Sequence, residues 1–318
     1  MVRRQVDLRP SVADAGEDRS TRAVLVALGV NLGVALAKTA ASVLSGSASM
    51  LAEAAHSWAD TGNQALLLIA DRRSRRLPDA KHPLGYGREA YVWSLLAAVG
   101  LFVVGASVSV WHGIIGLING GSGPGDYLVA YVVLAIVFAL ESTSLTQALR
   151  QLRAGASRYD RDLVEYALAT SDPTVRAVFA EDGSALIGLV IAAVGIGLHQ
   201  LTGYAIWDSI GSILVGILLG LIAVVLIDRN RRFLTGEPGF PELYNAVVAG
   251  ITELPEVAAV GFVRLEFVGP RQLFLVASVD LVGDRPESHI AYSLRRLERE
   301  LASNPHIVVA VLTIAEPA

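Results

Sequence analysis

The sequence contains no cysteine and only two methionines among its 318 residues. The lack of cysteine excludes disulfide bonds and thiolate metal sites, and the scarcity of methionine disfavours a pathway for a soft metal such as Cu(I). Residues 1–20 carry charge but no apolar core, so we expect no cleavable signal peptide. Any metal bound by this chain must be held by imidazole nitrogen and by oxygen.

Charged residues are also sparse, at 18% of the chain, whereas 53% is hydrophobic. This composition is too apolar for an ordinary soluble protein. The net charge of −4 indicates no particular partner, and we expect membrane lipid, not nucleic acid, around the chain. Six apolar stretches are each long enough to cross a hydrocarbon core, which needs roughly 20 helical residues. The spans are expected at 23–44, 48–70, 90–118, 127–149, 177–202 and 205–227.

The basic residues are unevenly placed between these spans. Lys and Arg gather at 3–22, 72–88, 150–176 and 229–232, whereas the connections at 45–47, 119–126 and 199–207 contain none. The positive-inside rule therefore places both termini in the cytoplasm. Abundant Arg and Ala beside only two lysines favour a bacterial source, so we expect the bacterial inner membrane.

After Arg232 the hydrophobic pattern changes to that of a small α+β domain. We expect a helix at 241–254, strands at 257–268 and 271–282, a helix at 286–303 and a strand at 306–315. This αββαβ order predicts a compact fold. The predicted organisation is an N-terminal cytoplasmic tail (1–22), a six-helix transmembrane domain (23–230) and a C-terminal cytoplasmic domain (231–318).

Two pairs of glycines have the spacing that permits close contact between membrane helices. They are Gly29 with Gly33 in the first span and Gly216 with Gly220 in the sixth. Small residues four apart let two backbones approach, but a glycine facing lipid is an equally good explanation for either pair.

Ionisable residues inside a membrane span indicate a functional site, because inserting each one at the centre of a membrane helix costs roughly 3 kcal/mol of free energy. The second span contains Glu53, His56 and Asp60, followed by Asn63 and Gln64. Their spacings of three and four place them on one helical stripe. A neutral imidazole and a carboxylate on adjacent turns form half of a tetrahedral zinc site, so another helix must supply the rest.

The fifth span offers Asp182, preceded by Glu181, in a stretch otherwise free of charge. Asp182 is the predicted third ligand. Adjacent helical residues point about 100 degrees apart, so both acids cannot face the site squarely. Glu181 is then a fourth ligand, a proton carrier or an interface residue. The alternative is that these groups only pair with one another, or with Lys38, to hold the bundle together.

Other polar residues in the spans have simpler explanations. Two explanations are equally good for Glu141: a polar contact with span two or five, or a role in coupling. His112 and His199 lie near span ends and are expected to be interfacial or satisfied histidines, not ligands. Asp208 complements the dipole at the start of span six. Lys38 snorkels, or neutralises a carboxylate of span two.

Four segments of the sequence carry a family resemblance. SGSASMLAEAAHSWADTGNQ, followed by KHPLGYGREAYVW, closely resembles the second span and following loop of the cation diffusion facilitators, the zinc-transporter family. SDPTVRAVFAEDGSALIG and TGYAIWDSIGS resemble the branch that contains zinc transporter nine. The resemblance covers nearly the whole chain. It implies six spans, a ferredoxin-like cytoplasmic domain, a homodimer and proton-driven export of divalent metal.

Carried over by position, the family's transport site falls on His56, Asp60 and Asp182. The fourth position, four residues before the last of these, is Val178, which cannot bind metal. The shell must then be completed by Glu181, Glu53 or water.

The family's secondary metal sites are incomplete in this chain. In the loop after span two, Asp79 and His82 match ligand positions, but the later histidine position is Tyr86. In the last domain His289 matches one ligand, and the terminal motif has alanine in place of its histidine, at Ala315. We expect no full binuclear site there, and a role in dimerisation.

The function predicted from these observations is export of zinc in exchange for protons by alternating access. Mn²⁺, Fe²⁺ and Co²⁺ remain alternatives, because imidazole and oxygen donors accept all of them. No organic cofactor is expected. An intramembrane metalloenzyme is disfavoured because no His-Glu-x-x-His motif occurs. A metal-binding receptor or scaffold that does not transport is the remaining alternative.

Overall fold

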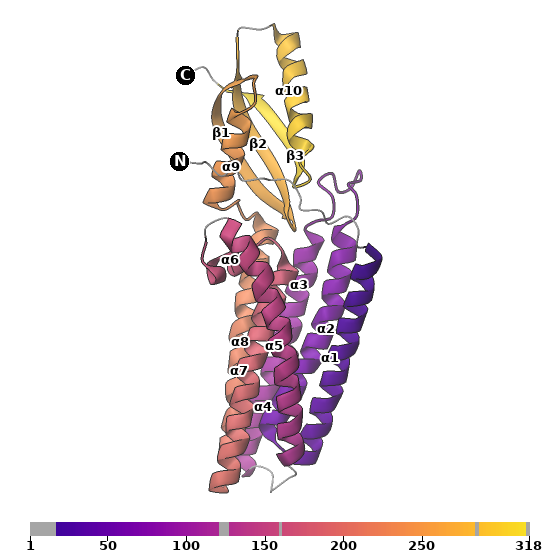
Figure 1. Cartoon of the computed structure of the whole chain (residues 1–318), viewed down its shortest axis with the longest axis vertical. Helices are drawn as coiled ribbons and strands as arrows, with labels where there is room; N and C mark the ends of the chain where they lie inside the picture. Colours follow the sequence, from indigo (N-terminus) through magenta and orange to yellow (C-terminus); the bar gives the residue numbers. More distant parts are fainter. Residues whose placement is uncertain (1–16, 121–126, 159–160, 284–285, 316–318) are drawn as a thin grey trace.

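The computed structural model describes residues 17–120, 127–158, 161–283 and 286–315. Long helical rods lie side by side along one axis, and a small α+β domain stands at one end of the bundle (Figure 1). The rods are α1 (Glu17–Ser45), α2 (Ala48–Ser74), the continuous α3 (Glu89–Gly100), π-helical η1 (Leu101–Ala106) and α4 (Ser107–Asn119), α5 (Tyr127–Arg158), α7 (Pro173–Thr202) and α8 (Ile206–Thr235).

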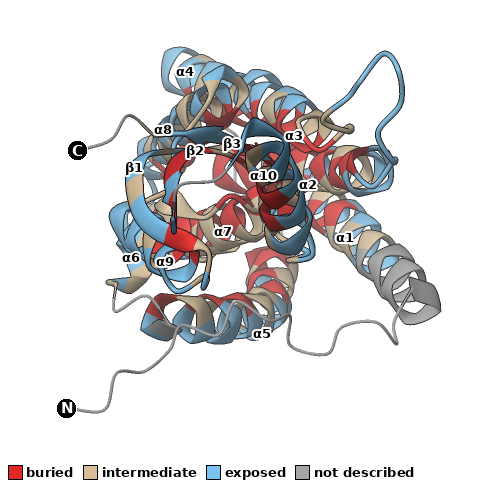
Figure 2. Ribbon diagram, turned by 90° about the horizontal axis from the view of Figure 1, so that it is seen from above, coloured by how far each residue is buried: buried red, intermediate tan, exposed pale blue. Residues whose placement is uncertain are grey.

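Five of the rods are long and apolar enough to cross a membrane, and α2 is the exception because of its polar residues. At 27 residues α2 is nevertheless long enough to span the bilayer. It packs against α1, α3, α7 and α8, so it lies within the bundle. Viewed along the bundle axis, buried residues face the space between the helices (Figure 2). The predicted six-helix membrane architecture is confirmed.

Capping residues explain where α7, the helix that carries Glu181 and Asp182, begins and ends. Asp172 caps α7, because its Oδ1 accepts hydrogen bonds from the amides of Thr174 and Val175, and Pro173 follows at the first helical position. Gly203 ends the same helix in a left-handed conformation, with φ 74°. Glu181 and Asp182 therefore lie between two sharply defined helix ends.

The connection between the fourth and fifth spans is shorter than predicted. α5 continues to Arg158, a short helix α6 (Leu163–Ala169) follows, and α7 already begins at Pro173. Arg176, counted above among the basic residues of that loop, is in fact in the first turns of α7 and only 1% exposed. The 75–88 connection and α6 both lie at the end of the bundle that carries the α+β domain (Figure 1).

The C-terminal domain has the predicted αββαβ order. It comprises α9 (Pro241–Thr252), β1 (Val257–Gly269), β2 (Gln272–Leu281), α10 (Glu287–Ala302) and β3 (Ile307–Ile314). The sheet order is β1-β2-β3, with β1 antiparallel and β3 parallel to β2. The α10 crossover returns the chain to β3, as a parallel pair requires. Leu275, Ile251 and Leu297 are buried between the sheet and the helices, so the predicted ferredoxin-like class is confirmed.

The two glycine pairs differ in their surroundings. A Cβ added at Gly216 would lie 2.7 Å from Val110 Cγ2 and 2.9 Å from the carbonyl oxygen of Ala106. Gly216 therefore allows α8 to approach α4 and η1 closely. For Gly29 and Gly33, no atom of the described residues lies within 4 Å of an added Cβ, so neither makes such a contact there.

We expect Gly216→Ala to destabilise the bundle by about 1–3 kcal/mol, because the added methyl group meets backbone atoms that cannot move freely. Thermal unfolding of the purified protein in detergent measures this loss. Gly33→Ala is the matched control, since it adds the same methyl group to open space in a membrane helix. A Gly216→Ala protein as stable as this control would contradict the close contact.

Candidate metal-transport site

The polar stripe of α2 faces the interior of the bundle. Glu53, His56 and Asn63 are 0%, 1% and 2% exposed. His56 Nε2 lies 3.5 Å from Asp60 Oδ2, as expected for residues one turn apart. The spacing read from the sequence thus brings an imidazole and a carboxylate together inside the bundle.

Several buried polar atoms on this stripe have no hydrogen-bond partner among the described residues. They include both ring nitrogens of His56 and Oδ1 of Asp60. The same holds for Glu53 Oε1, Asn63 Oδ1 and Gln64 Oε1. A buried polar group without a partner costs about 1–3 kcal/mol, so a row of them calls for a ligand or another compensating role. Unpartnered imidazole and carboxylate atoms are suitable ligands for a divalent metal.

The two adjacent acids of α7 diverge, as helix geometry predicts. Glu181 accepts a hydrogen bond from Nδ2 of Asn63 and therefore faces α2. Asp182 Oδ2 instead accepts a 2.6 Å hydrogen bond from the Ser144 hydroxyl of α5. Across the interface between α2 and α7, the direct contact is thus made by Glu181. The spacing of residues along α7 does not by itself determine which of the two acids faces α2.

The described residues do not form a closed metal cage. Among them no three His, Asp or Glu side chains gather closely enough to hold an ion. His56 and Asp60 are together, and Asp60 lies within electrostatic range of Glu181, Glu141 and Asp182. The structure therefore brings half of the predicted site together and places the acids of α5 and α7 around it, while the ligand set itself stays a prediction.

Glu53 has a different partner. Its Oε2 lies 2.8 Å from Nζ of Lys38 on α1, and both side chains are 0% exposed. Of the two roles predicted for Lys38, the structure supports neutralisation of a span-two carboxylate and not snorkelling. A buried lysine is satisfied by such a pair, which also joins α1 to α2.

Asp208 at the start of α8 caps a neighbouring helix. Its carboxylate accepts hydrogen bonds from the Ser47 hydroxyl at 2.7 Å and from the amides of Ala48 and Ser49. Asp208 is predicted to complement the dipole of its own helix, but its side-chain hydrogen bonds are to the N-terminus of α2. Asp208 therefore holds the N-terminus of α2 in place relative to α8.

In the loop after α2, Asp79 is occupied by hydrogen bonds within the loop. Its Oδ1 accepts from the amides of Lys81 and His82, and its Oδ2 accepts from the Tyr86 hydroxyl at 2.6 Å. The Tyr86 hydrogen bond is the main reason that the pKa of Asp79 is lowered from its ordinary value. The tyrosine at the family's histidine position thus acts as a donor to Asp79.

The candidate residues of the C-terminal domain are less informative. His289 is exposed near the start of α10. Ala315 follows β3, and the last three residues, including Glu316, lie outside the described residues. At the ends of α5 and α7 away from the α+β domain, His199 contacts the Tyr127 hydroxyl at 3.2 Å, in agreement with the expectation of a satisfied histidine.

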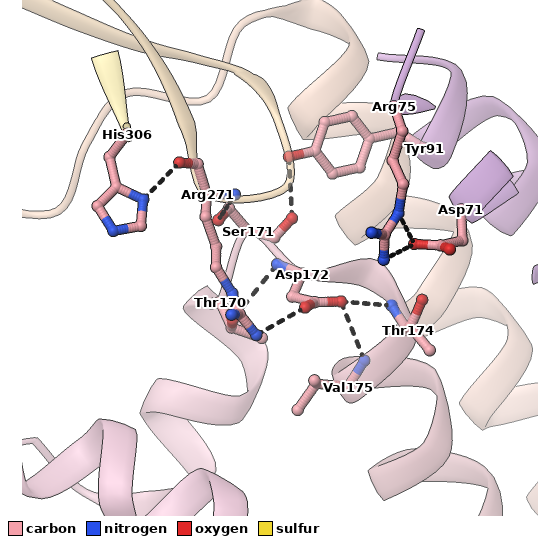
Figure 3. Close-up of polar contacts among 10 residues, drawn as sticks. All are labelled: Asp71, Arg75, Tyr91, Thr170, Ser171, Asp172, Thr174, Val175, Arg271 and His306. Carbon is pink, nitrogen blue, oxygen red and sulfur yellow. Dashed lines mark hydrogen bonds and ion pairs between the residues drawn. The ribbon is translucent and has the colours of Figure 1, made fainter. Parts of the chain in front are cut away.

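The α+β domain contacts the membrane bundle through the turn between β1 and β2 (Figure 3). The amide of Arg271, which has a positive φ of 58°, donates to the Ser171 hydroxyl at 3.0 Å. Its guanidinium reaches Asp172 Oδ2 at 3.2 Å. Tyr91 of α3 donates to the Ser171 carbonyl at 2.9 Å. The corner that precedes α7 is therefore held from both sides.

Arg176 lies beside this corner. Its guanidinium donates to the carbonyl of Thr170 at 2.9 Å and to Asn230 Oδ1 of α8 at 2.7 Å. It also lies over the ring of Phe233, 5.0 Å from the centroid. These contacts explain why a basic residue that resembles a loop residue in sequence is buried here.

The fold and the site together define a polytopic membrane protein with imidazole and carboxylate groups facing the centre of its helical bundle. A family model described as the cation efflux transmembrane domain matches residues 24–234. The chain belongs to this cation efflux family. The resemblance to cation diffusion facilitators is thereby confirmed.

Relatives extend this likeness beyond the membrane domain. Metal tolerance protein C4 of Arabidopsis thaliana is 37% identical over 270 residues, which cover 85% of this chain and 59% of the relative. The human mitochondrial proton-coupled zinc antiporter SLC30A9 is 35% identical over 263 residues, covering 82% of this chain and 46% of the relative. The chain thus spans about half the length of these relatives. Zinc transporter ZitB of Escherichia coli is 28% identical over 256 residues, 80% of this chain and 76% of the relative.

Proposed function

We propose that this protein exports a divalent metal ion, zinc in the first place, from the cytoplasm in exchange for protons. The observation that carries the proposal is the buried pair His56 and Asp60, whose unpartnered atoms face the bundle interior. Relatives named as a proton-coupled zinc antiporter and as a zinc transporter support the choice of metal and of coupling. Mn²⁺, Fe²⁺ and Co²⁺ are the competing cargoes, because the same donor atoms accept them.

The proposed ligands are His56 and Asp60 of α2 with Asp182 of α7. Glu181 is the proposed fourth ligand, since it already faces α2 through Asn63. Asp182 would exchange its hydrogen bond with Ser144 for the ion. A movement of α7 relative to α2 would then both close the site and change the side from which it is reached, as alternating access requires.

Proton exchange follows from the ligand types. Metal binding requires a neutral imidazole and ionised carboxylates, so protons and metal compete for the same atoms. Protons arriving from the outer side displace the ion, and their release to the cytoplasm restores the empty site. No separate proton site and no organic cofactor are needed for this cycle.

We further propose a homodimer in a bacterial inner membrane, with both termini in the cytoplasm and domain limits near residues 22 and 230. The basic connections support this orientation, because the 75–88 loop and the α+β domain lie at the same end of the bundle (Figure 1). Dimerisation is assigned to the α+β domain by the family resemblance. Crosslinking of the protein in native membranes tests it.

The direct test is zinc flux in proteoliposomes. An imposed pH gradient should drive zinc across the membrane, and collapse of the gradient by an ionophore should stop it. Competition by Mn²⁺, Fe²⁺ and Co²⁺ in the same assay identifies the preferred cargo. A protein that binds zinc in equilibrium dialysis but moves none under the gradient would be a receptor or scaffold, and the transport proposal would be wrong.

A further inference from the structure

Lys38 introduces a fixed positive charge beside the predicted transport site. It is one of only two lysines in the sequence, and the other, Lys81, is in the loop after α2. The ammonium group lies inside the bundle at 0% exposure and contacts Glu53 at 2.8 Å. Charged groups in membrane helices are rare and are retained mainly where they serve function.

The Glu53 carboxylate is held by one oxygen only. Oε2 binds Lys38, whereas Oε1 has no hydrogen-bond partner among the described residues. On the other side, α7 leaves room for this oxygen, because a Cβ added at Gly188 would lie 2.5 Å from Oε1. Glu53 is three residues before His56, on the same stripe of α2. Its free oxygen thus lies against α7 at Gly188, while its charge is balanced by Lys38.

The charge of Lys38 also reaches part of the polar centre. Besides Glu53, it acts on His56 and Asp60 of α2 and on Glu141 of α5. Glu181 and Asp182 of α7 act on the same Asp60. The described centre therefore combines acids from three helices with the Lys38 ammonium group of α1.

We propose that Lys38 is a positioning residue that sets the metal affinity of the transport site by keeping Glu53 out of the ligand shell. The inference rests on the proposed transport function. A transported ion must bind tightly enough to enter and weakly enough to leave. With Lys38 in place, one carboxylate is neutralised and the nearby cation opposes the charge of the metal, so both effects favour release.

This role predicts opposite effects from the two halves of the ion pair. Lys38→Met leaves a buried, uncompensated Glu53 carboxylate, which gains most by binding the metal. We expect the Kd and KM for zinc to fall about tenfold and kcat to fall as release slows. Glu53→Gln leaves the Lys38 charge unbalanced beside the site, so Kd and KM should rise about tenfold.

The double variant, Lys38→Met with Glu53→Gln, removes both charges and should bring the Kd to within about threefold of the unmodified protein. Lys38→Arg keeps the positive charge, so its Kd and KM for zinc should match those of the unmodified protein. Zinc binding is measured by calorimetry on the full-length protein in detergent, and flux in proteoliposomes. If Lys38→Met does not fold, Lys38→Gln retains a donor to Glu53 without the charge.

Two results would show that the pair is only a structural contact between α1 and α2. One is a change of the zinc Kd in the same direction in both single variants. The other is a double variant whose Kd differs from that of the unmodified protein as much as the Kd of the less affected single variant. The binding arm separates this result from failure of the proposed function. If zinc binds with the predicted pattern of Kd values but no flux is driven, the role of Lys38 holds and transport is wrong. If zinc does not bind the unmodified protein, both are wrong.

Discussion

Replacement of His56 or Asp60 by alanine should abolish zinc uptake by inverted membrane vesicles, lowering flux by more than about a hundredfold, since even outer partners of metal ligands contribute 10–100-fold. Neither side chain is needed to satisfy another described group, because His56 makes no protein hydrogen bond and lies only within ion-pair distance of Asp60. The loss should therefore be one of metal binding and not of folding.

Ser57→Ala is the matched control for these variants. Ser57 is buried on α2 next to His56 but is not one of the proposed ligands, and its replacement by alanine removes a single hydroxyl. Its flux should stay within about twofold of the unmodified protein, because no proposed ligand is changed. Unchanged flux in His56→Ala, with the thermal stability of the control, would remove the basis of the proposed site.

The second large effect is expected at the acids of α7. Asp182→Asn should abolish flux, because the amide keeps the hydrogen bond to Ser144 but supplies no anionic ligand. Glu181→Gln should lower flux about tenfold, since the amide oxygen can still accept from Asn63 while a ligand charge is lost. Vesicle flux and zinc binding are measured together for both variants.

Ser144→Ala separates the ligand role of Asp182 from its local hydrogen bond. It removes the 2.6 Å contact without changing the charge, so flux should fall no more than about threefold. If Glu181→Gln abolished flux and Asp182→Asn preserved it, the third ligand would be Glu181. The assignment carried over from the family would then be wrong for this chain.

The membrane bundle and the outline of its centre could be predicted from sequence for clear physical reasons. Long apolar runs have one stable form in a bilayer, and a spacing of three and four residues fixes a common helix face. His56 and Asp60 are therefore together, as predicted. The αββαβ order was predictable because strand and helix periodicities differ.

What could not be predicted is how each helix is rotated against its neighbours. The contacts Asn63 with Glu181, and Ser144 with Asp182, join residues far apart in the chain. Their formation depends on the packing of all the rods together, including the close approach of α8 to α4 at Gly216. The same applies to the pair of Lys38 and Glu53, which the sequence offered only as one of two roles for that lysine.

The burial of Arg176 illustrates a second limit. A basic residue beside a polar connection is normally solvated, and the positive-inside rule treats it so. Here the carbonyl of Thr170, the amide of Asn230 and the ring of Phe233 surround the guanidinium. None of these three residues has a pattern in the sequence that marks it as a partner.

The Asp172 carboxylate makes two kinds of contact. Its Oδ1 accepts hydrogen bonds from the first free amides of α7, and its Oδ2 accepts one from the guanidinium of Arg271 in the β1–β2 turn. Movement of the α+β domain away from the bundle would thus loosen the first turn of α7, the helix that bears Glu181 and Asp182. The Asp172 side chain is thus one of the contacts through which movement of the α+β domain would reach α7, within three turns of the acids.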